Sequence, residues 1–203
     1  MRTAGNEHLS KAEWRERLTG ARSAAPTARR VAEAGALARH VARLPRATTV
    51  CGYVPFGSEP GSLALLDVLL AAGSRVLLPV VPPAPGPLDW AEYTGSSSLA
   101  PGRFRGVLEP TGDRLGESAV ELAELVLVPA LAVDHHGVRL GRGAGFYDRS
   151  LGATSRADLV AIVRDEELVP RLPAEPHDAL MSGVLLPGRG LVRLPLTPPG
   201  SAS

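Results

Sequence analysis

The sequence contains one cysteine, Cys51, and one lysine, Lys11, among its 203 residues. A single cysteine excludes an internal disulfide and any zinc site built from several cysteines. Basic and acidic residues nearly cancel, at 22 against 21, which argues against a dedicated nucleic-acid binder because such a protein needs an uncompensated basic face. No run approaches the roughly 20 apolar residues that cross a bilayer, and no signal-peptide pattern is present. We therefore expect a cytoplasmic protein, a monomer or weak homo-oligomer, with no nucleic-acid or membrane partner.

Apolar residues make up 44% of the chain, enough for the core of one domain spanning residues 1–203, with ends that fray over 1–9 and 195–203. A capping box that begins at Ser10 predicts a first helix, and Pro26-Thr27 starts a second that runs to about Leu44. A buried strand over 48–54, a helix over 62–72 and a strand over 75–81 then form a strand–helix–strand unit, which implies a parallel sheet.

The remaining pattern extends this sheet. It predicts an antiparallel or edge strand over 88–93, a buried strand within 123–133, a helix from Phe146, a strand over 159–163, and short final strands over 183–186 and 191–194. The expected fold is a three-layer α/β sandwich with a mostly parallel sheet and helices on both faces, Rossmann-like and similar in architecture to isomerases and CoA-transferases. Ligands bind beyond the carboxyl ends of such strands, so we expect the loops 55–61 and 134–147 to share that rim.

The densest cluster of chemically useful residues is the segment 128–149, VPALAVDHHGVRLGRGAGFYDR. Its three glycines free the backbone to curl, so that N–H groups converge on one anion, and its two central arginines carry forked donors that match phosphate oxygens. The segment therefore predicts a phosphate cradle; the alternative is a hairpin over 134–140 with a glycine-rich turn and no ligand. The residues concerned are Gly141, Gly143 and Gly145, with Arg139 and Arg142.

Asp148 follows this loop in the first turn of the predicted helix, where an exposed carboxylate beside phosphates can hold Mg²⁺. Two common nucleotide motifs are excluded. The last position of a G-x-G-x-x-G match falls on Phe146, and a Walker A loop needs a lysine directly after its glycines.

Two further segments carry candidates for binding. Lys11 and Arg15 are four residues apart on one helical face, from which both charges can close over phosphates, although such a pair is more often a solvated face. Lys11 is the single lysine in a chain whose other strongly basic residues are all arginine. This favours a functional role for Lys11, because an ammonium is a compact, strongly hydrated charge unlike a guanidinium. Glu59 lies in YVPFGSE and either hydrogen-bonds an amine-rich ring or is an exposed turn residue.

The aromatic residues are few, and four of the eight flank the two rim loops: Tyr53, Phe56, Phe146 and Tyr147. Flat side chains at a rim suit a flat heteroaromatic ligand, and core packing explains any one of them equally well.

Other polar positions are predicted to be structural. His135 and His136 are adjacent, point apart in an extended segment and make a poor metal pair, so we expect loop residues. Cys51 fits a small core residue. His177 and Asp178 form either a polar pair near the rim or a plain turn.

The segment VPALAVDHHGVRLGRGAGFYDRSL resembles the signature of the 5-formyltetrahydrofolate cyclo-ligase family, also called methenyltetrahydrofolate synthetases. The likeness covers most of residues 10–187. Lys11 and Arg15 fit an N-terminal K-x-x-x-R, the segment 53–59 fits the folate side, and RVLLPVV, Glu109-Pro110 and LPAEPHD with Met181 fall in register.

This resemblance implies an enzyme that uses Mg-ATP to phosphorylate the formyl oxygen of 5-formyltetrahydrofolate. A neighbouring amine nitrogen then attacks the activated carbon, which gives 5,10-methenyltetrahydrofolate, ADP and phosphate. Lys11, Arg142 and Tyr147 would be catalytic, and Asp148 would coordinate Mg²⁺. Folate would contact Val54, Glu59, Arg142, Gly143, Ala144, Gly145 and Phe146. ATP would contact Lys11, Arg15, Arg139, Leu140, Gly141, Arg142, Gly143, Ala144, Gly145, Phe146 and Tyr147.

Two positions depart from the family pattern. Ala144 stands where some members have lysine, and Ser182 stands where an aspartate often supplies a second metal contact. Two alternatives stay open. One is a non-catalytic folate or nucleotide binder, which these two departures support. The other is an enzyme like a sugar-phosphate isomerase or a CoA-transferase, which needs a carboxylate base and leaves Lys11 and the aromatic rim unexplained.

Overall fold

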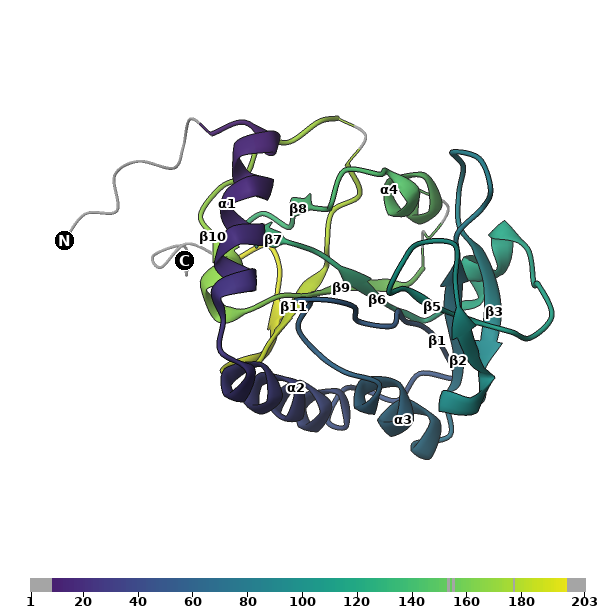
Figure 1. Ribbon diagram of the computed structural model, residues 1–203. Coiled ribbons are helices and arrows are strands. Elements are labelled where there is room, and N and C mark those ends of the chain that lie inside the picture. The colour runs from purple at the N-terminus through teal and green to yellow at the C-terminus, as the bar shows by residue number, and fades with distance from the viewer. Residues whose placement is uncertain (1–8, 153, 155, 177, 197–203) are drawn as a thin grey trace, which may run out of the picture.

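The computed structural model describes residues 9–152, 154, 156–176 and 178–196. At its centre lies a seven-stranded sheet in the order β12-β11-β9-β6-β1-β2-β3 (Figure 1). The five inner strands run parallel and the two edge strands, β3 and β12, run antiparallel, which confirms the predicted mostly parallel sheet and its antiparallel strand near residues 88–93. The strands are β1 (Thr49–Cys51), β2 (Arg75–Val80), β3 (Asp89–Tyr93), β6 (Leu125–Pro129), β9 (Asp158–Ile162), β11 (Gly183–Leu186) and β12 (Gly190–Arg193).

The inner strands are buried on both faces because their side chains alternate between two apolar clusters. One cluster lies under helices α2 (Thr27–Val41) and α3 (Ala64–Ala71), which cover the lower face in Figure 1. There Leu125 and Leu127 of β6 meet Leu37 of α2 and Leu66 of α3. Both helices begin and end inside their predicted ranges.

The opposite face is covered by shorter elements, the 3₁₀ helix η2 (Glu117–Leu122) and helix α4 (Phe146–Leu151). Val126 and Val128 of β6 pack there with Val120 of η2 and Leu151 of α4. Helical segments therefore lie on both faces, as predicted, and the thinner cover on this face leaves room for loops above the sheet.

The buried strand predicted within 123–133 is confirmed as β6, and the same range also contains the start of a second sheet. β6 ends at Pro129, and the chain then enters a second, three-stranded sheet as β7 (Ala132–Asp134) between β10 (Leu168–Val169) and β8 (Arg139–Leu140). The Leu131 amide already donates to the Leu140 carbonyl at 2.7 Å, so the backbone bonds change sheets within two residues. Helix α1 (Lys11–Ala24) covers this small sheet through Trp14 and Leu18.

The hairpin considered over 134–140 is present as β7 and β8. Asp134 Oδ1 accepts the amides of His136 and Val138 at 2.8 and 2.9 Å, which closes the turn. His135 and His136 lie in this turn, and Cys51 is fully buried, as predicted. The hairpin directs the glycine-rich loop back to the carboxyl ends of the central strands.

Smaller elements complete the chain: β4 (Leu99–Pro101) pairs with β5 (Leu108–Pro110), and η1 (Ser96–Ser98) and η3 (Asp165–Glu167) are single turns. The Leu196 amide donates to the His135 carbonyl at 2.8 Å, so the last described residue is hydrogen-bonded to the turn between β7 and β8. Within the described ranges, no helix has the length and apolar character needed to cross a bilayer.

Candidate active site

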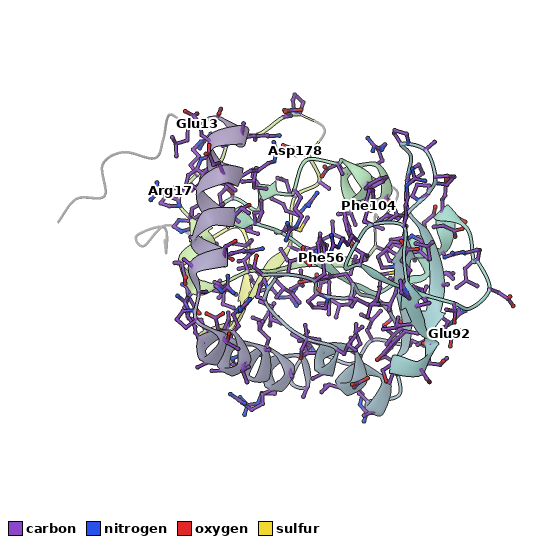
Figure 2. The ribbon with its side chains drawn as sticks, in the orientation of Figure 1. Glu13, Arg17, Phe56, Glu92, Phe104 and Asp178 are labelled. Carbon is purple, nitrogen blue, oxygen red and sulfur yellow. The ribbon has the colours of Figure 1, made fainter. Side chains whose placement is uncertain are left out.

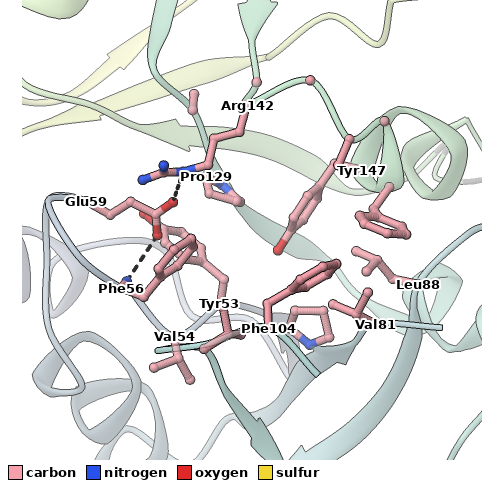
Figure 3. Close-up of a pocket in the computed structure, with 18 of the residues that line it drawn as sticks. Tyr53, Val54, Phe56, Glu59, Val81, Leu88, Phe104, Pro129, Arg142 and Tyr147 are labelled. Carbon is pink, nitrogen blue, oxygen red and sulfur yellow. Dashed lines mark hydrogen bonds and ion pairs between the residues drawn. The ribbon is translucent and has the colours of Figure 1, made fainter. Parts of the chain in front are cut away.

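A pocket of about 330 Å³ lies at the carboxyl ends of β1, β2 and β6. The loops that follow β1 and β8 meet there, as expected for parallel strands that end at one edge (Figure 3). Its lining consists of Tyr53, Val54, Phe56, Glu59, Pro79, Val81, Leu88, Phe104, Val107, Leu108, Pro129, Ala130, Arg139, Gly141, Arg142, Gly143, Ala144, Gly145, Phe146, Tyr147 and Asp148.

The pocket walls are mainly apolar and aromatic. All four aromatic residues expected at the rim line the pocket, and Phe104 joins them. The Phe104 ring lies 6.4 Å from that of Phe146, centroid to centroid, at a tilted angle. Such a wall suits a planar ligand that can stack between rings.

Phe104 was not among the residues that the sequence predicted for the site. Phe104 lies in the loop between β4 and β5 and remains 46% exposed at the pocket. Val107 and Leu108 reach the pocket from the same hairpin. The one available signal was an aromatic residue between two arginines in a polar, glycine-bounded loop.

The glycine-rich loop curls as predicted: Gly143 and Gly145 adopt positive φ angles of 101° and 72°. Each of its three glycines also lies against a different arginine. A Cβ at these glycines would fall between 2.7 and 3.4 Å from a guanidinium atom, closer than ordinary van der Waals contact. The pairs are Gly141 with Arg139, Gly143 with Arg15, and Gly145 with Arg149.

Positive charge around this loop is only partly neutralised. Arg15 Nε donates to the Gly141 carbonyl at 2.9 Å, and Arg149 Nη2 donates to the Ala144 carbonyl at 2.8 Å. Both guanidinium groups thus bond to neutral oxygens here. These two arginines, which have no carboxylate partner among the described residues, lie beside the backbone N–H groups of the loop, an arrangement that suits phosphate oxygens. Helix α4 spans only six residues, so the arginines rather than its dipole supply this charge.

Glu59 has a side chain only 5% exposed, and both of its carboxylate oxygens are bonded. Oε1 accepts Arg142 Nε at 2.9 Å, and Oε2 accepts the Phe56 amide at 3.2 Å (Figure 3). Burial raises the pKa of Glu59, while the Phe56 amide and the Arg142 charge act against this rise. Glu59 is therefore a pocket residue and not an exposed turn glutamate.

Tyr147 points its hydroxyl into the pocket (Figure 3). The hydroxyls of Tyr147 and Tyr53 are both buried with no hydrogen-bond partner among the described residues. Burial, followed by the nearby charge of Glu59, raises the pKa of both tyrosines, so each hydroxyl stays protonated at neutral pH. Two unbonded donors at a pocket are available to oxygens of a ligand.

Lys11, Arg15 and Leu140 do not line the pocket. Lys11 Nζ is bonded to Glu175 Oε1 at 3.0 Å and to Asp178 Oδ2 at 3.1 Å. Burial lowers the pKa of Lys11, but these two carboxylates outweigh it and the net shift is upward. The Leu140 side chain packs under α1, so only its backbone adjoins the loop.

Lys11 nevertheless lies on the same side of α1 as the glycine-rich loop, because Arg15, one turn further on, reaches that loop. Figure 2 shows Asp178 between α1 and α4, with Glu13 and Arg17 on the other side of α1. His177 lies outside the described residues.

Asp148 is the pocket's candidate metal ligand. Its side chain is 38% exposed and paired with Arg139. The described residues contain no cluster of three or more His, Cys, Asp or Glu that could hold an ion alone. Mg²⁺ commonly uses one or two carboxylates together with phosphate oxygens and water, and a single carboxylate beside a phosphate loop fits that mode. Ser182 lies elsewhere, bonded to Asp158 Oδ1 at 3.0 Å.

Comparison with known proteins identifies the family. A model of the 5-formyltetrahydrofolate cyclo-ligase family matches residues 7–187. The chain belongs to this family. The 5-formyltetrahydrofolate cyclo-ligase of Mycolicibacterium smegmatis is 49% identical over 191 residues, which cover 91% of this chain and 97% of the relative. That of Escherichia coli K12 is 33% identical over 146 residues, 70% of this chain and 80% of the relative.

Solved structures agree with the fold of this cyclo-ligase. The 5,10-methenyltetrahydrofolate synthetase of Aquifex aeolicus superimposes with a TM-score of 0.77 at 24% identity, over 93% of this chain and 95% of that one. The synthetase of Mycoplasma pneumoniae gives 0.68 at 18% identity, over 87% and 98%. The family match and the 49% identical relative show that the chain is a cyclo-ligase enzyme that acts on a small-molecule folate, which excludes the isomerase-like alternative.

Proposed function

We propose that this enzyme consumes Mg-ATP to convert 5-formyltetrahydrofolate into 5,10-methenyltetrahydrofolate, ADP and phosphate. One observation carries the proposal. A single pocket combines an aromatic wall and a buried carboxylate on one side with a glycine-rich loop and two arginines on the other. A planar pterin and a triphosphate would therefore meet within one enclosure.

The folate side is built on the loop after β1. Glu59 is buried but accepts only two hydrogen bonds, so its oxygens can accept further N–H groups from a pterin ring. Val54 and the backbone of residues 142–146 would pack on the same ring, with Phe104 on the exposed side. The apolar walls exclude water from the reacting atoms.

The phosphate side is built on the loop after β8. Gly141, Gly143, Ala144 and Gly145 present backbone N–H groups, and Arg139, Arg142 and Arg15 surround them. Leu140, Phe146 and Tyr147 would contribute as neighbours along the chain. Lys11 would reach the phosphates by leaving its two carboxylates, which a triphosphate can replace as a partner for the ammonium.

The reaction needs positioning and charge neutralisation more than a protein nucleophile. The formyl oxygen attacks the γ-phosphorus and ADP leaves. The neighbouring amine nitrogen then bonds to the activated carbon, loses its proton, and phosphate departs with the former formyl oxygen. Arg142 and Lys11 would neutralise the charge on the transferred group, and the Tyr147 hydroxyl would donate to one of its oxygens.

Asp148 would hold Mg²⁺, which neutralises phosphate charge when bound. Asp148→Asn should raise the Mg²⁺ concentration needed for half-maximal rate several-fold, because the amide is a weaker ligand for a hard cation. The matched control is Asp158→Asn, a surface carboxylate paired with Arg193 outside the pocket, which should leave the Mg²⁺ requirement unchanged. Equal Mg²⁺ dependence in both variants would remove the metal role.

The deciding experiment mixes the protein with 5-formyltetrahydrofolate and Mg-ATP and follows the ultraviolet absorbance of the methenyl product. We expect product to form only when ATP is present. Binding of both ligands without product would instead support a non-catalytic binder. An absence of both product and binding would refute the proposed function.

A further inference from the structure

One ion pair joins the two sides of the pocket. Glu59 belongs to the loop after β1 and Arg142 to the glycine-rich loop, 83 residues later in the chain, and their Oε1 and Nε atoms lie 2.9 Å apart. Glu59 is on the folate side of the proposed site, whereas Arg142 is on the phosphate side. The pair therefore connects two groups that different ligands would engage.

The two partners differ in their freedom to move. The Glu59 side chain is 5% exposed and also bonded to the Phe56 amide, so it is fixed in place. Arg142 is 40% exposed, lies with its Cζ 4.7 Å from the Phe56 ring centroid, and bonds to Glu59 through Nε alone. Its two terminal nitrogens have no bonded partner among the described residues. The arginine can thus turn toward an anion while the carboxylate stays.

We propose that this ion pair couples the binding of the two substrates, so that each binds more tightly when the other is present. The proposal rests on the function given above. Phosphates on the glycine-rich loop draw Arg142 away from Glu59, and N–H groups of the folate take its place on the carboxylate.

The sign of the coupling follows from the state of Glu59. A buried carboxylate that loses its cation without a replacement is strongly unfavourable. A nucleotide that binds without folate either draws Arg142 away and leaves the Glu59 carboxylate without a cation, or binds without a contact from Arg142. With folate already bound, Glu59 keeps hydrogen-bond donors and Arg142 is released at lower cost. Linkage then requires the nucleotide to tighten folate binding by the same factor.

Isothermal titration calorimetry tests this directly. The dissociation constant of 5-formyltetrahydrofolate is measured alone and with a saturating, non-hydrolysable Mg-ATP analogue, and the reverse titration measures the analogue with and without folate. We expect both constants to fall by the same factor, about 5-fold or more.

Variants locate the coupling in the pair. Glu59→Gln and Arg142→Gln should each bring the coupling factor close to one. If one variant binds a ligand too weakly to titrate, the other variant is sufficient for the test. The matched control is Arg15→Gln, which touches the same loop at Gly141 but not Glu59. This variant should weaken binding of the ATP analogue and leave the coupling factor unchanged.

Two results would overturn the inference: no coupling in the wild-type protein, or an unchanged factor in the Glu59 and Arg142 variants. Turnover measured in parallel separates these results from a failure of the proposed function. An active enzyme without coupling refutes only the inference, whereas an inactive protein that binds neither ligand refutes both.

Discussion

Lys11 is held by carboxylates on the face of α1 that adjoins the pocket. Its ammonium bonds to Glu175 and Asp178, and its side chain is 21% exposed. Ion pairs with this degree of solvent contact contribute little to the folded state, because water and side-chain entropy offset most of the attraction. We therefore expect Lys11 to affect ligand binding more than stability.

Lys11→Ala should raise the KM for ATP and lower kcat, while the free energy of unfolding changes by at most about 1 kcal/mol. Lys11→Arg is the conservative control: it keeps the charge and should retain part of the ATP affinity. Steady-state kinetics and urea denaturation provide the two measurements. A large loss of stability with normal ATP kinetics would show that Lys11 is structural.

Gly141→Ala would place a Cβ 2.7 Å from Arg139 Nη1, and Arg139 is itself fixed by Asp148 and the Pro129 carbonyl. We expect about 1–3 kcal/mol of destabilisation from this overpacking, together with a loss of turnover as the loop shifts. In the matched control, Gly152→Ala, the added methyl meets nothing within 4 Å. It should leave activity unchanged, and an equal activity loss in both variants would contradict the close-packing argument.

Several site residues were predictable because their signals are local. Glycine spacing is enough to predict the curled loop, and strand order is enough to place Glu59 beside it. Phe104 was not predictable, since its place depends on how the β4–β5 hairpin folds across the end of β2. The carboxylate partners of Lys11 likewise come from a segment more than 160 residues later.

Among the helices, α1 is attached at its last turn by a buried arginine. Arg22 is 1% exposed and donates to Glu167 through Nε and Nη2, both at 2.7 Å. Nη2 also donates to the carbonyl of Ala130, a pocket residue, at 2.7 Å. Helical periodicity predicts α1 and places position 22 one turn after Leu18, but its partner Glu167 lies 145 residues later, so this attachment was not visible in the sequence.

Arg22→Met should destabilise the fold by about 3–5 kcal/mol, because Glu167 is left as a buried charge without its main partner. Arg29→Met is the matched control on α2, where a 46% exposed arginine pairs with Glu33 and Glu166; its loss should change stability by less than about 1 kcal/mol. Guanidinium denaturation measures both. Similar values for the two variants would contradict the role of burial.

The break after β6 shows where sequence patterns lose information. The run over 125–133 is apolar throughout because both sheets are buried, and a buried strand carries no alternation that would mark its end. Pro129 was the only local sign of a boundary. The parallel pairing of β1 and β2 was predictable, since two apolar strands separated by one helix form a right-handed crossover.

At the scale of the whole molecule, the pocket depends on distant parts of the chain that meet only after folding. The loops after β1, β2, β6 and β8 and the β4–β5 hairpin all contribute to its lining. A ligand that bridges them binds the native state and not the unfolded chain. Ligand binding should therefore stabilise the entire domain.

At about 100 times its dissociation constant, 5-formyltetrahydrofolate should add about 2.7 kcal/mol of stability. For a domain of this size that corresponds to a rise in Tm of about 5–10 °C. Differential scanning fluorimetry measures the shift, and Glu59→Gln at the same ligand concentration should give a smaller one. An identical shift in this variant would place the folate elsewhere.

The lone lysine on α1 offers a spectroscopic handle. Reductive methylation with ¹³C-labelled formaldehyde would mark one side chain in all 203 residues, besides the terminal amine. The resulting methyl resonance would differ between an ammonium held by Glu175 and Asp178 and one facing phosphates. A single NMR signal would thus report on the surroundings of the Lys11 ammonium at each step of a nucleotide titration.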